Sequence, residues 1–488
     1  MHVVPLPRHL SPAGQGVLEL GGSPRVAVPS GRLLGLGRVV AVLLGGSAQV
    51  GGEAEVTLTL GAGDGEEYEL VVTAEGAIVT AGSAEGLFRG ATTLAQLVTE
   101  DRTVPCVRAG DGPALAWRGL SLDVARRFFT VEQVKRVIDL LALYKFNVLH
   151  LHLTDSQAWR LQISAWPRLT GPESYTHDDY REIVAYAAER FVTVVPEIDM
   201  PGHVLAAVRA YPELGGEDEP AHPLVPFLDP RAEVTWRFVA DVLGEVAALT
   251  PGPYLHIGGD EAFGMPDELY AAFVTRALGL ARATGKRVVG WQEVGRSGAL
   301  TSADLAQCWV GDGDAFDPEA ARKTAPPQYH PLIDLAAAAF EQAPHDVPRA
   351  VAAGAAVLAS PSRVLYLDRR YAEPSVLEEQ NERRERVGFA SYRPMTSREY
   401  FGWRPGELVE IPAGARLAGV EAAIWCETVG DFDDLAFLLL PRLAGVAEKA
   451  WTDRATTWED YRERVRTHTA WWERLGWGGY YRSADLFT

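Results

Sequence analysis

Cysteine is scarce in this sequence. Its 488 residues contain three, Cys106, Cys308 and Cys426, an odd number at wide spacings. Zinc motifs need closely spaced cysteine pairs, and a disulfide framework needs an even set, so the sequence favours neither. Each cysteine lies among apolar residues, which predicts three buried free thiols.

Positive charge is also in short supply, and this argues against two classes of partner. The chain has 65 acidic residues against 46 Lys and Arg, a formal net charge of -19. Nucleic acids and anionic membranes both attract basic surfaces, so we expect neither as a partner. We interpret the excess acid as a well-solvated surface.

Long apolar runs are missing as well. No segment reaches the ~18 consecutive apolar residues of a membrane span, and the first residues do not form a basic stretch leading into an apolar one. The sequence therefore predicts a cytoplasmic protein without a membrane partner, although a secreted protein whose leader had been removed would look the same. The oligomeric state cannot be read from the sequence.

The length predicts two or three domains. Residues 1–113 alternate short strands with Gly-rich turns and contain a helix pattern at 83–97, which predicts a small α+β domain. Strand and helix patterns then alternate, which predicts an α/β fold with a (β/α)8 TIM barrel over 114–455. Residues 456–488 predict a helical segment that packs on the barrel. The eight expected strands are 118–124, 148–154, 192–198, 254–257, 287–290, 304–309, 364–367 and 419–425.

Acids and tryptophans gather at the predicted carboxyl ends of these strands, where barrels place their active sites. Carboxylates hold sugar hydroxyls by charge-assisted hydrogen bonds, and aromatic rings pack on the C–H face of a pyranose. The set therefore predicts a carbohydrate site. Its members are Asp123, Arg126, Asp155, His203, Asp260, Glu261, Trp291, Glu293, Trp309, Tyr366, Asp368, Trp425 and Glu427.

Some of these positions also have plainer interpretations. By spacing alone, Arg126 is expected at the surface, and Glu293 is expected to brace the barrel rim. The position of His203 fits a helix cap as well as a ligand-binding residue. Arg118, at the start of its strand, predicts a structural residue. The three strand-end tryptophans together favour a site over core packing.

Asp260 and Glu261 are the most informative pair, because they follow Gly258 and Gly259 directly at a strand end. Most retaining glycosidases place two carboxylates about 5 Å apart on either side of the scissile bond. Neighbouring side chains at a strand end point in different directions, so two adjacent acids do not readily give that arrangement. Burying two acids costs desolvation energy, which is more easily explained if both carry out a function. The pair therefore predicts that the two acids have different roles from those of a nucleophile and an acid on either side of the bond.

Seven motifs, in order along nearly the whole chain, resemble the β-N-acetylhexosaminidases of glycoside hydrolase family 20. They are WRGLSLDVARRFF (117–129), HLHLTD (150–155), PEIDMPGH (196–203), HIGGDE (256–261), GWQE (290–293), YLD (366–368) and EAAIWCE (421–427). Residues 86–97 resemble the end of the family's N-terminal domain.

The resemblance implies a role for each site residue. Glu261 would be the general acid/base, Asp260 would bind the N–H of the substrate's 2-acetamido group, and Tyr366 would bind its carbonyl oxygen. Asp155 and His203 would tune Glu261, and the tryptophans would wall the pocket of the terminal sugar. The hydroxyls would be bound by Asp368, Glu427 and an arginine, placed at Arg118 because the family's arginine opens the Arg-Gly motif. The implied substrate-binding residues are Arg118, Asp155, His203, Trp291, Trp309, Asp368, Trp425 and Glu427.

The implied activity is exo-acting hydrolysis of terminal non-reducing GlcNAc, or GalNAc, from small glycans with retention of configuration. The substrate's own acetamide carbonyl would attack the anomeric carbon and give an oxazolinium intermediate, a known exception to the two-carboxylate rule. No cofactor is implied, and no metal is expected because no histidine cluster has ligand spacing.

Two alternatives stay open at this stage. One is a retaining glycosidase with a protein nucleophile, in which Glu261 is the acid and Glu427 attacks. The other is a carbohydrate-binding barrel without catalysis. The chain also departs from the family pattern: residues 311–350 are longer than a barrel loop needs, as an ordered insertion or a flap, and residues 389–392 occupy the place where many members have a tryptophan.

Overall fold

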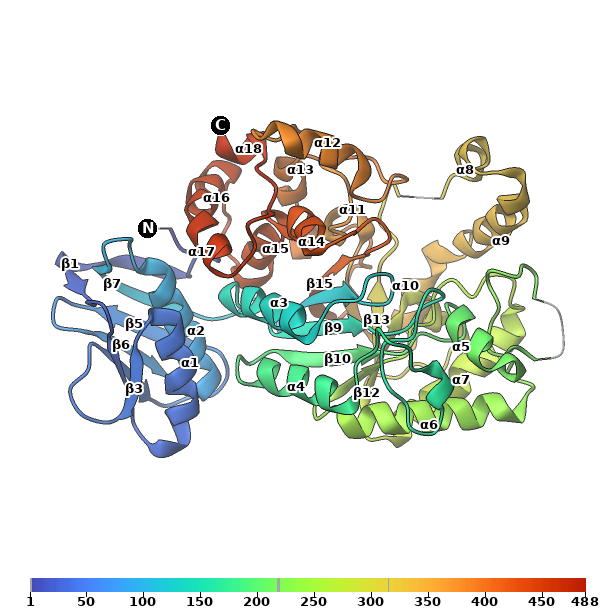
Figure 1. Cartoon of the computed structure of the whole chain (residues 1–488), viewed down its shortest axis with the longest axis horizontal. Coiled ribbons are helices and arrows are strands. Elements are labelled where there is room, and N and C mark those ends of the chain that lie inside the picture. Colours follow the sequence, from blue (N-terminus) through green and yellow to red (C-terminus); the bar gives the residue numbers. More distant parts are fainter. Residues whose placement is uncertain (1, 217–219, 315) are drawn as a thin grey trace.

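A closed barrel forms the centre of the molecule. The computed structural model describes residues 2–216, 220–314 and 316–488. Eight parallel strands close in the order β10-β11-β12-β13-β14-β15-β8-β9, with the sheet of residues 9–111 preceding them (Figure 1). The predicted TIM barrel with a preceding α+β unit is confirmed. The barrel strands are β8 (Trp117–Asp123), β9 (Val148–His152), β10 (Thr193–Glu197), β11 (Tyr254–His256), β12 (Arg287–Trp291), β13 (Leu305–Cys308), β14 (Ala356–Ala359) and β15 (Leu417–Ile424).

Helices follow the strands around the barrel, and two of the early ones start at capping boxes. The Thr130 side chain accepts from the backbone N–H of Gln133, and the Thr176 side chain accepts from that of Asp179. In return, the side chains of Gln133 and Asp179 accept from the backbone N–H of their cap residue. Such reciprocal bonds satisfy backbone donors that the first turn leaves unpaired. The helices are α3 (Val131–Leu143), α4 (His177–Ala188), α5 (Leu205–Ala210), α6 (Glu233–Leu249), α7 (Asp267–Ala283), α8 (Pro318–Thr324), α9 (His330–Phe340), α10 (Ala343–Ala352), α11 (Ser362–Leu365), α12 (Glu378–Arg386), α13 (Ser397–Phe401), α14 (Phe432–Leu439) and α15 (Arg442–Trp451).

The seventh strand does not lie where the sequence predicts it. The strand is Ala356–Ala359, which pairs with β13 and β15, whereas most of the predicted 364–367 lies in the short helix α11 and the loop after it. Both stretches are short apolar runs, and periodicity cannot separate a buried strand from a helical turn over four residues. Because the strand ends earlier, Tyr366 comes from the loop after β14, where it forms a bridge with Ala423.

The segment 311–350 is built largely of helices. It contains α8 and α9 and most of α10, and α8 and α9 extend outward beyond the barrel on the side away from the N-terminal sheet (Figure 1). Residue 315, within this segment, lies outside the described residues.

The N-terminal sheet has seven strands in the order β1-β7-β5-β6-β4-β2-β3. Helix α2 packs on β5 and β6, and its Gln96 side chain donates 2.8 Å to the carbonyl of Leu143 in the barrel. This helix therefore contacts both units. The elements are β1 (His9–Glu19), β2 (Arg25–Val28), α1 (Leu34–Leu44), β3 (Ser47–Val50), β4 (Val56–Leu60), β5 (Tyr68–Val72), β6 (Ala77–Ala81), α2 (Ala84–Leu97) and β7 (Thr103–Asp111).

A buried ion pair joins the sheet to the barrel. Lys145, just after α3, is fully buried, and its Nζ lies 3.0 Å from Asp111 Oδ2 of β7. Trp451 Nε1 donates to the same oxygen at 2.9 Å, and the ammonium lies over the Trp451 ring at 4.6 Å. A buried charge needs a paired partner, so these three residues depend on one another.

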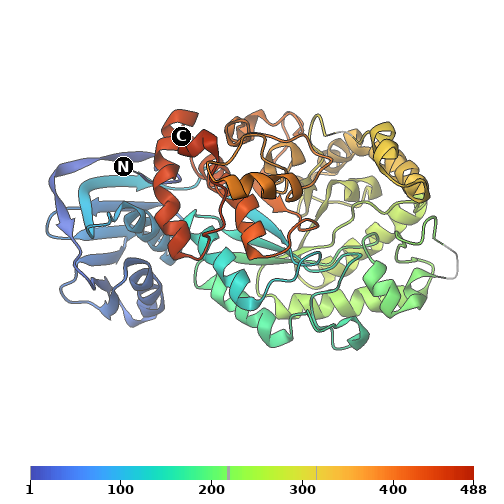
Figure 2. The same ribbon diagram turned by 45° about the horizontal axis from the view of Figure 1, so that its top comes forward.

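Three helices close the chain: α16 (Trp458–Val465), α17 (Thr469–Arg474) and α18 (Ala484–Phe487). Trp472 Nε1 donates 2.7 Å to the hydroxyl of Tyr144, and Arg464 donates 2.8 Å to the carbonyl of Val3. Figure 2 shows these C-terminal helices between the N-terminal sheet and the barrel.

Two further predictions concern free cysteines and membrane-spanning helices. All three cysteines are buried and free. Across the described part of the chain, no helix combines the length and the apolar character that crossing a membrane requires.

We predict that Asp111→Asn destabilises the protein by about 3–5 kcal/mol, because it leaves the Lys145 ammonium buried without its counter-charge. Urea unfolding would measure the loss. Glu55→Gln is the matched control, since Glu55 pairs with Arg25 at the surface of the same unit and its loss should leave the midpoint unchanged. Equal unfolding midpoints for Asp111→Asn and wild type would contradict the prediction.

Candidate active site

Carboxylates and imidazoles alternate through the barrel interior. His150 and His152 point inward together because they are two residues apart on β9. His150 Nδ1 lies 2.8 Å from Glu421 Oε1, and His150 Nε2 lies 2.9 Å from Glu197 Oε2. His152 Nδ1 lies 2.6 Å from the same Glu197 oxygen. These four side chains form the inner half of what we call the charge string.

The outer half of the charge string leads to the paired acids at the barrel mouth. His152 Nε2 lies 2.9 Å from Asp155 Oδ2, and His203 Nδ1 lies 3.2 Å from Asp155 Oδ1. The other nitrogen of His203 lies 3.4 Å from Glu261 Oε2 and 3.6 Å from Asp260 Oδ2. One imidazole therefore faces both members of the pair.

The surrounding carboxylates favour the protonated form of these imidazoles. An ionised carboxylate only accepts hydrogen bonds, so His152, with a carboxylate oxygen in hydrogen-bond contact at each nitrogen, carries two protons when both acids are ionised. Burial lowers the pKa of His150, but Glu421 and Glu197 outweigh it and raise the pKa to about 9. Burial likewise opposes the charge on His152 and His203, and the carboxylates beside them raise both pKa values. The charge string thus alternates negative and positive groups.

The turn after β11 requires its two glycines. Gly258 has φ 67° and Gly259 has φ 108°, conformations that side chains disfavour. A Cβ on Gly258 would lie 1.7 Å from Asp199 Oδ1, and one on Gly259 would lie 2.4 Å from Val294 Cγ1. Glu261 itself has φ 48°, a strained conformation of the kind that concentrates at active sites.

Asp260 offers an unsatisfied acceptor. Burial raises its pKa, Asp199 raises it further, and His203 acts in the opposite direction. Its Oδ1 is buried and has no hydrogen-bond partner among the described residues. A ligand N–H donated to this oxygen, beside the His203 imidazolium, would stabilise the ionised carboxylate.

Four aromatic side chains pack together at this end of the barrel. Trp309 stacks parallel to Tyr366 with ring centroids 6.3 Å apart, and Trp425 meets Tyr366 edge-on at 5.8 Å. Trp291 lies 5.8 Å from Trp425. They supply the flat apolar faces that pyranose binding requires.

Buried carboxylates fix two of these rings. Trp291 Nε1 donates 2.8 Å to Glu197 Oε1, so Glu197 binds both the charge string and an aromatic wall. Trp309 Nε1 donates to both oxygens of Glu293 at 3.1 Å. Glu293 therefore positions Trp309. This is a more specific role than the brace at the barrel rim that its spacing suggested.

Arg126 is the arginine of this site. Its Nη2 lies 2.8 Å from Asp155 Oδ2 and 3.9 Å from Glu427 Oε1, and its guanidinium carbon lies 5.3 Å from the centre of the Trp425 ring. Nearby, Asp368 is buried, its Oδ1 has no partner in the described part of the chain, and burial followed by Glu427 raises its pKa.

Arg118 does not reach this site, and its contacts do not support the predicted role in sugar binding. It lies at the start of β8, at the opposite end of the strand, with its side chain 1% exposed. Its guanidinium pairs with Glu66 of the N-terminal unit and donates to the carbonyls of Lys145 (2.9 Å) and Leu115 (2.7 Å). The plainer interpretation of Arg118 as structural agrees with these contacts.

The other predicted site residues lie at or just after the carboxyl ends of the barrel strands, and the contacts described above bring them together. The sequence reasoning gave no site role to Glu421, His150 and His152, and it left Arg126 open between a site residue and a surface residue. A signal for the two histidines was present, because polar residues at alternate positions of a fully buried strand point to the same side, here into the barrel.

Several of these side chains also have metal-ligating atoms close together. The sets His150–Glu197–His256, His152–Glu197–Asp199 and Asp199–His203–Asp260 each bring their ligand atoms within 4.8 Å. A metal needs neutral imidazole, whereas the contacts of the charge string hold His150, His152 and His203 protonated. The geometry therefore suits hydrogen bonding better than metal binding.

The catalytic-domain model of glycosyl hydrolase family 20 matches residues 115–268 and 333–454, and the model of the family's domain 2 matches residues 1–112. The chain belongs to glycosyl hydrolase family 20. It is therefore a glycoside hydrolase.

Related members of family 20 cover most of the chain. A β-N-acetylhexosaminidase of Cellulomonas fimi is 39% identical over 439 residues, 86% of this chain and 80% of that protein. The solved family 20 β-N-acetylhexosaminidase of Streptomyces coelicolor A3(2) has a TM-score of 0.84 at 36% identity, covering 99% of this chain and 98% of that one. A mutant β-hexosaminidase of Streptomyces plicatus, solved with the product GlcNAc, has a TM-score of 0.83 at 34% identity, covering 99% and 97%.

The raised pKa of His150 predicts a pH-dependent stability. Protonation of His150 favours the folded state, so its contribution is complete below pH 6.5 and is lost as the pH rises through about 9. Glu421→Gln removes one carboxylate that raises this pKa. Urea unfolding free energies of the variant should therefore fall less between pH 6.5 and 9 than those of wild type.

Glu448→Gln is the control for this experiment. Glu448 is buried against Arg464 and contacts no histidine of the charge string, so its loss should lower stability and keep the wild-type pH slope. Parallel pH curves for Glu421→Gln and wild type would contradict the prediction.

The two arginines give a second prediction. Arg126→Gln should lower kcat/KM for an aryl glycoside substrate about 10- to 100-fold, the effect of losing hydrogen bonds from a charged donor. Arg118→Gln should lower the melting temperature and leave kcat/KM of the folded enzyme unchanged. The reverse pattern would return the sugar-binding role to Arg118.

Proposed function

We propose that this chain is an exo-acting, retaining β-N-acetylhexosaminidase that removes terminal non-reducing GlcNAc, or GalNAc, by substrate-assisted catalysis. One observation carries the proposal: a single His203 imidazole faces both Asp260 and Glu261, beside a group of four aromatic rings. The names of the related proteins and the GlcNAc in the Streptomyces plicatus structure support the same activity.

In the proposed reaction, the nucleophile is the carbonyl oxygen of the substrate's 2-acetamido group. Asp260 accepts the acetamido N–H through its carboxylate and stabilises the positive charge that develops on the nitrogen. Burial raises the pKa of the Tyr366 hydroxyl, so it stays protonated and can donate to the attacking carbonyl oxygen. The oxygen attacks the anomeric carbon and gives an oxazolinium intermediate.

Glu261 transfers the protons. It donates one to the leaving oxygen in the first step and removes one from the incoming water in the second, so two inversions give net retention. Its side chain is 28% exposed, which lets water reach it. The strained φ of Glu261 and the contact with His203 hold the carboxyl in one orientation.

The terminal sugar would lie against the tryptophans, with its hydroxyls bound by Arg126, Asp368 and Glu427. Arg126 takes the role that the resemblance gave to Arg118. Asp155 keeps the His203 imidazole protonated and in place, and His203 in turn acts on Glu261 and Asp260. A pocket with aromatic walls suits a chain end, which is why we propose exo action. A cytoplasmic location stays a prediction.

The alternative with a protein nucleophile fits these contacts less well. Glu427, its nucleophile, lies at a part of the site where Arg126 is 3.9 Å away, and its side chain is 37% exposed. It would leave Asp260 and its buried free oxygen without a role. A purely sugar-binding barrel would not need the alignment of His203 with Glu261.

Aryl β-glycosides of GlcNAc, GalNAc and glucose test the proposal on wild type, Asp260→Asn and Glu261→Gln. Wild type should cleave the acetamido sugars and leave the glucoside. Asp260→Asn should lower kcat for the acetamido sugars about 100- to 1,000-fold, the usual cost of removing a group that stabilises transition-state charge. Glu261→Gln should lose most activity on poor leaving groups and regain part of it on good ones.

Glu268→Gln is the matched control, because Glu268 is an exposed acid shortly after the pair, in the first turn of α7. It should keep wild-type rates. Strong turnover of the glucoside would favour the protein nucleophile, and no turnover of any substrate would favour the binding protein.

A further inference from the structure

The backbone around Asp260 has little rigidity of its own. Asp260 lies between two residues with positive φ, Gly259 at 108° and Glu261 at 48°. Glycine adopts many backbone conformations because it has no Cβ. Any rotation at Gly259 would change where the Asp260 side chain points. The site therefore needs a contact that holds this part of the chain in one orientation.

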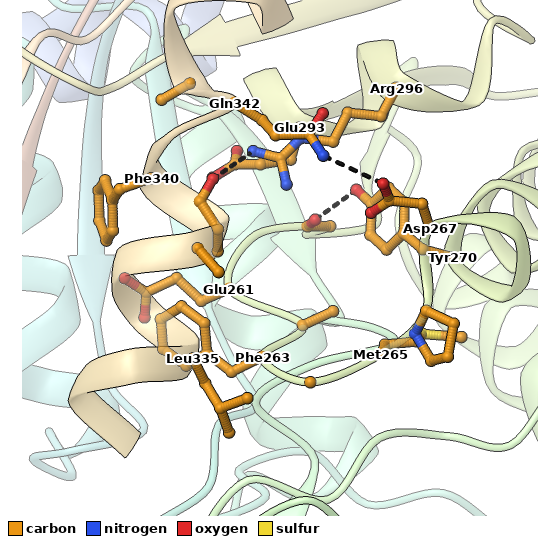
Figure 3. Close-up of a pocket in the computed structure, with 17 residues that line it drawn as sticks. Glu261, Phe263, Met265, Asp267, Tyr270, Glu293, Arg296, Leu335, Phe340 and Gln342 are labelled. Atoms are coloured by element: carbon orange, nitrogen blue, oxygen red, sulfur yellow. Dashed lines mark hydrogen bonds between the residues drawn. The ribbon is translucent and has the colours of Figure 1, made fainter. Parts of the chain in front are cut away.

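Tyr270 makes such a contact from helix α7. It is buried in the first turn of that helix, and its hydroxyl donates to the carbonyl oxygen of Gly259 at 2.5 Å. In Figure 3 this bond joins Tyr270 to the loop after β11, with Glu261 further along the same loop. Burial raises the pKa of the Tyr270 hydroxyl, so it stays protonated and can donate. A side chain on a helix fixes its partner more precisely than one on a loop.

The turn is also held from the barrel side. The Gly259 N–H donates to Asp199 Oδ1 at 3.1 Å, and the carbonyl of Gly258 accepts from the backbone N–H of Trp291 at 2.9 Å. Among the described residues, the carbonyl of Gly259 accepts from Tyr270 alone. Because this carbonyl belongs to the peptide that leads into Asp260, the Tyr270 hydroxyl holds the last backbone unit before the carboxylate.

We propose that Tyr270 is a positioning residue, which fixes the Gly259–Asp260 peptide and so holds the Asp260 carboxylate where it accepts the acetamido N–H of the substrate. The inference rests on the proposed function, because it gives Tyr270 a part in the step that Asp260 assists. A misplacement of about 1 Å can cost on the order of 100-fold in rate. Tyr270 thus affects the reaction through Asp260.

A small hollow borders this contact and limits the contribution of Tyr270 to stability. It has a volume of about 310 Å³, and both Gly259 and Tyr270 line it (Figure 3). A hollow of this size has room for several waters. When the hydroxyl is removed, a water can donate to the Gly259 carbonyl in its place, but it does not hold the peptide as a side chain does. Loss of the hydroxyl should therefore lower activity and leave the melting temperature close to that of wild type.

Tyr270→Phe tests the proposal with an aryl β-glycoside of GlcNAc. It should lower kcat about tenfold, the cost of one hydrogen bond that matters in the transition state, and leave KM within about twofold. Tyr270→Met also lacks the donor and has a flexible side chain that adapts to the same space, so it should give the same result if the first variant folds poorly.

Tyr180→Phe is the matched control. Tyr180 is also buried, and its hydroxyl lies 2.9 Å from Thr250 Oγ1, near the amino-terminal end of β11 and away from the site. This variant loses a buried hydroxyl contact of the same kind and should keep the wild-type kcat.

A double variant tests whether Tyr270 acts through Asp260. In the Asp260→Asn background the carboxylate is already lost, so adding Tyr270→Phe should lower kcat less than about twofold. The same tenfold loss in both backgrounds would mean that the two residues act independently, and it would overturn the proposal.

The outcomes also separate this inference from the proposed function. If wild type does not cleave the GlcNAc glycoside, the proposed function fails. If wild type cleaves it and both Tyr270 variants keep the wild-type kcat, or change KM alone, the function stands and Tyr270 has no positioning role.

Discussion

The interleaving of carboxylates with imidazolium groups along the barrel interior is the interaction on which the rest of the structure depends. Barrels of this kind are usually filled by layers of branched apolar side chains. Here Glu421, His150 and Glu197 occupy part of that space with charge. An isolated charge buried in this way costs several kcal/mol, and only neighbours of opposite sign offset the cost. Each charged member of the charge string is therefore stabilised by a neighbour of opposite sign.

This arrangement connects the fold directly to the chemistry. Glu197 accepts from the Trp291 indole and also faces His152, so the position of a pocket wall and the protonation of the charge string depend on one carboxylate. At the mouth, the side chain of Glu261 is 28% exposed, more than those of His203 and Asp260. In the proposed reaction, proton transfer takes place at this outer end of the charge string, while the buried members hold His203 in place.

The sequence predicts the fold well where runs of apolar residues are long and bounded by clear turns. The strands ending near Asp123, His152, Glu197 and His256 lie close to where the patterns place them. The seventh strand is different, because the apolar run Ala356–Ala359 and the apolar run 364–367 are equally plausible as a strand. Only their pairing with β13 and β15 decides between them.

The site is predictable to a similar degree. Motifs at strand ends identify the acids and tryptophans, because the fold brings strand ends together whatever the loops do. They do not identify partners, which depend on side-chain direction. Arg118 and Arg126 lie only eight positions apart, yet one points to the N-terminal unit and the other to the sugar site. The roles of His150 and Glu421 could not be assigned from spacing, since their partners come from different strands.

The Lys145–Asp111 pair has a consequence for how this protein can evolve. Domains are exchanged between proteins most easily when few contacts cross their boundary. The ammonium belongs to the barrel, its counter-charge belongs to the sheet, and both are fully buried. A barrel transferred to a new protein without the sheet would lose the counter-charge of Lys145 and the sheet side chains that pack on Ala142 and Trp451. The two units are therefore expected to be inherited together, so that the sheet is a permanent part of the barrel's own core and not an exchangeable accessory.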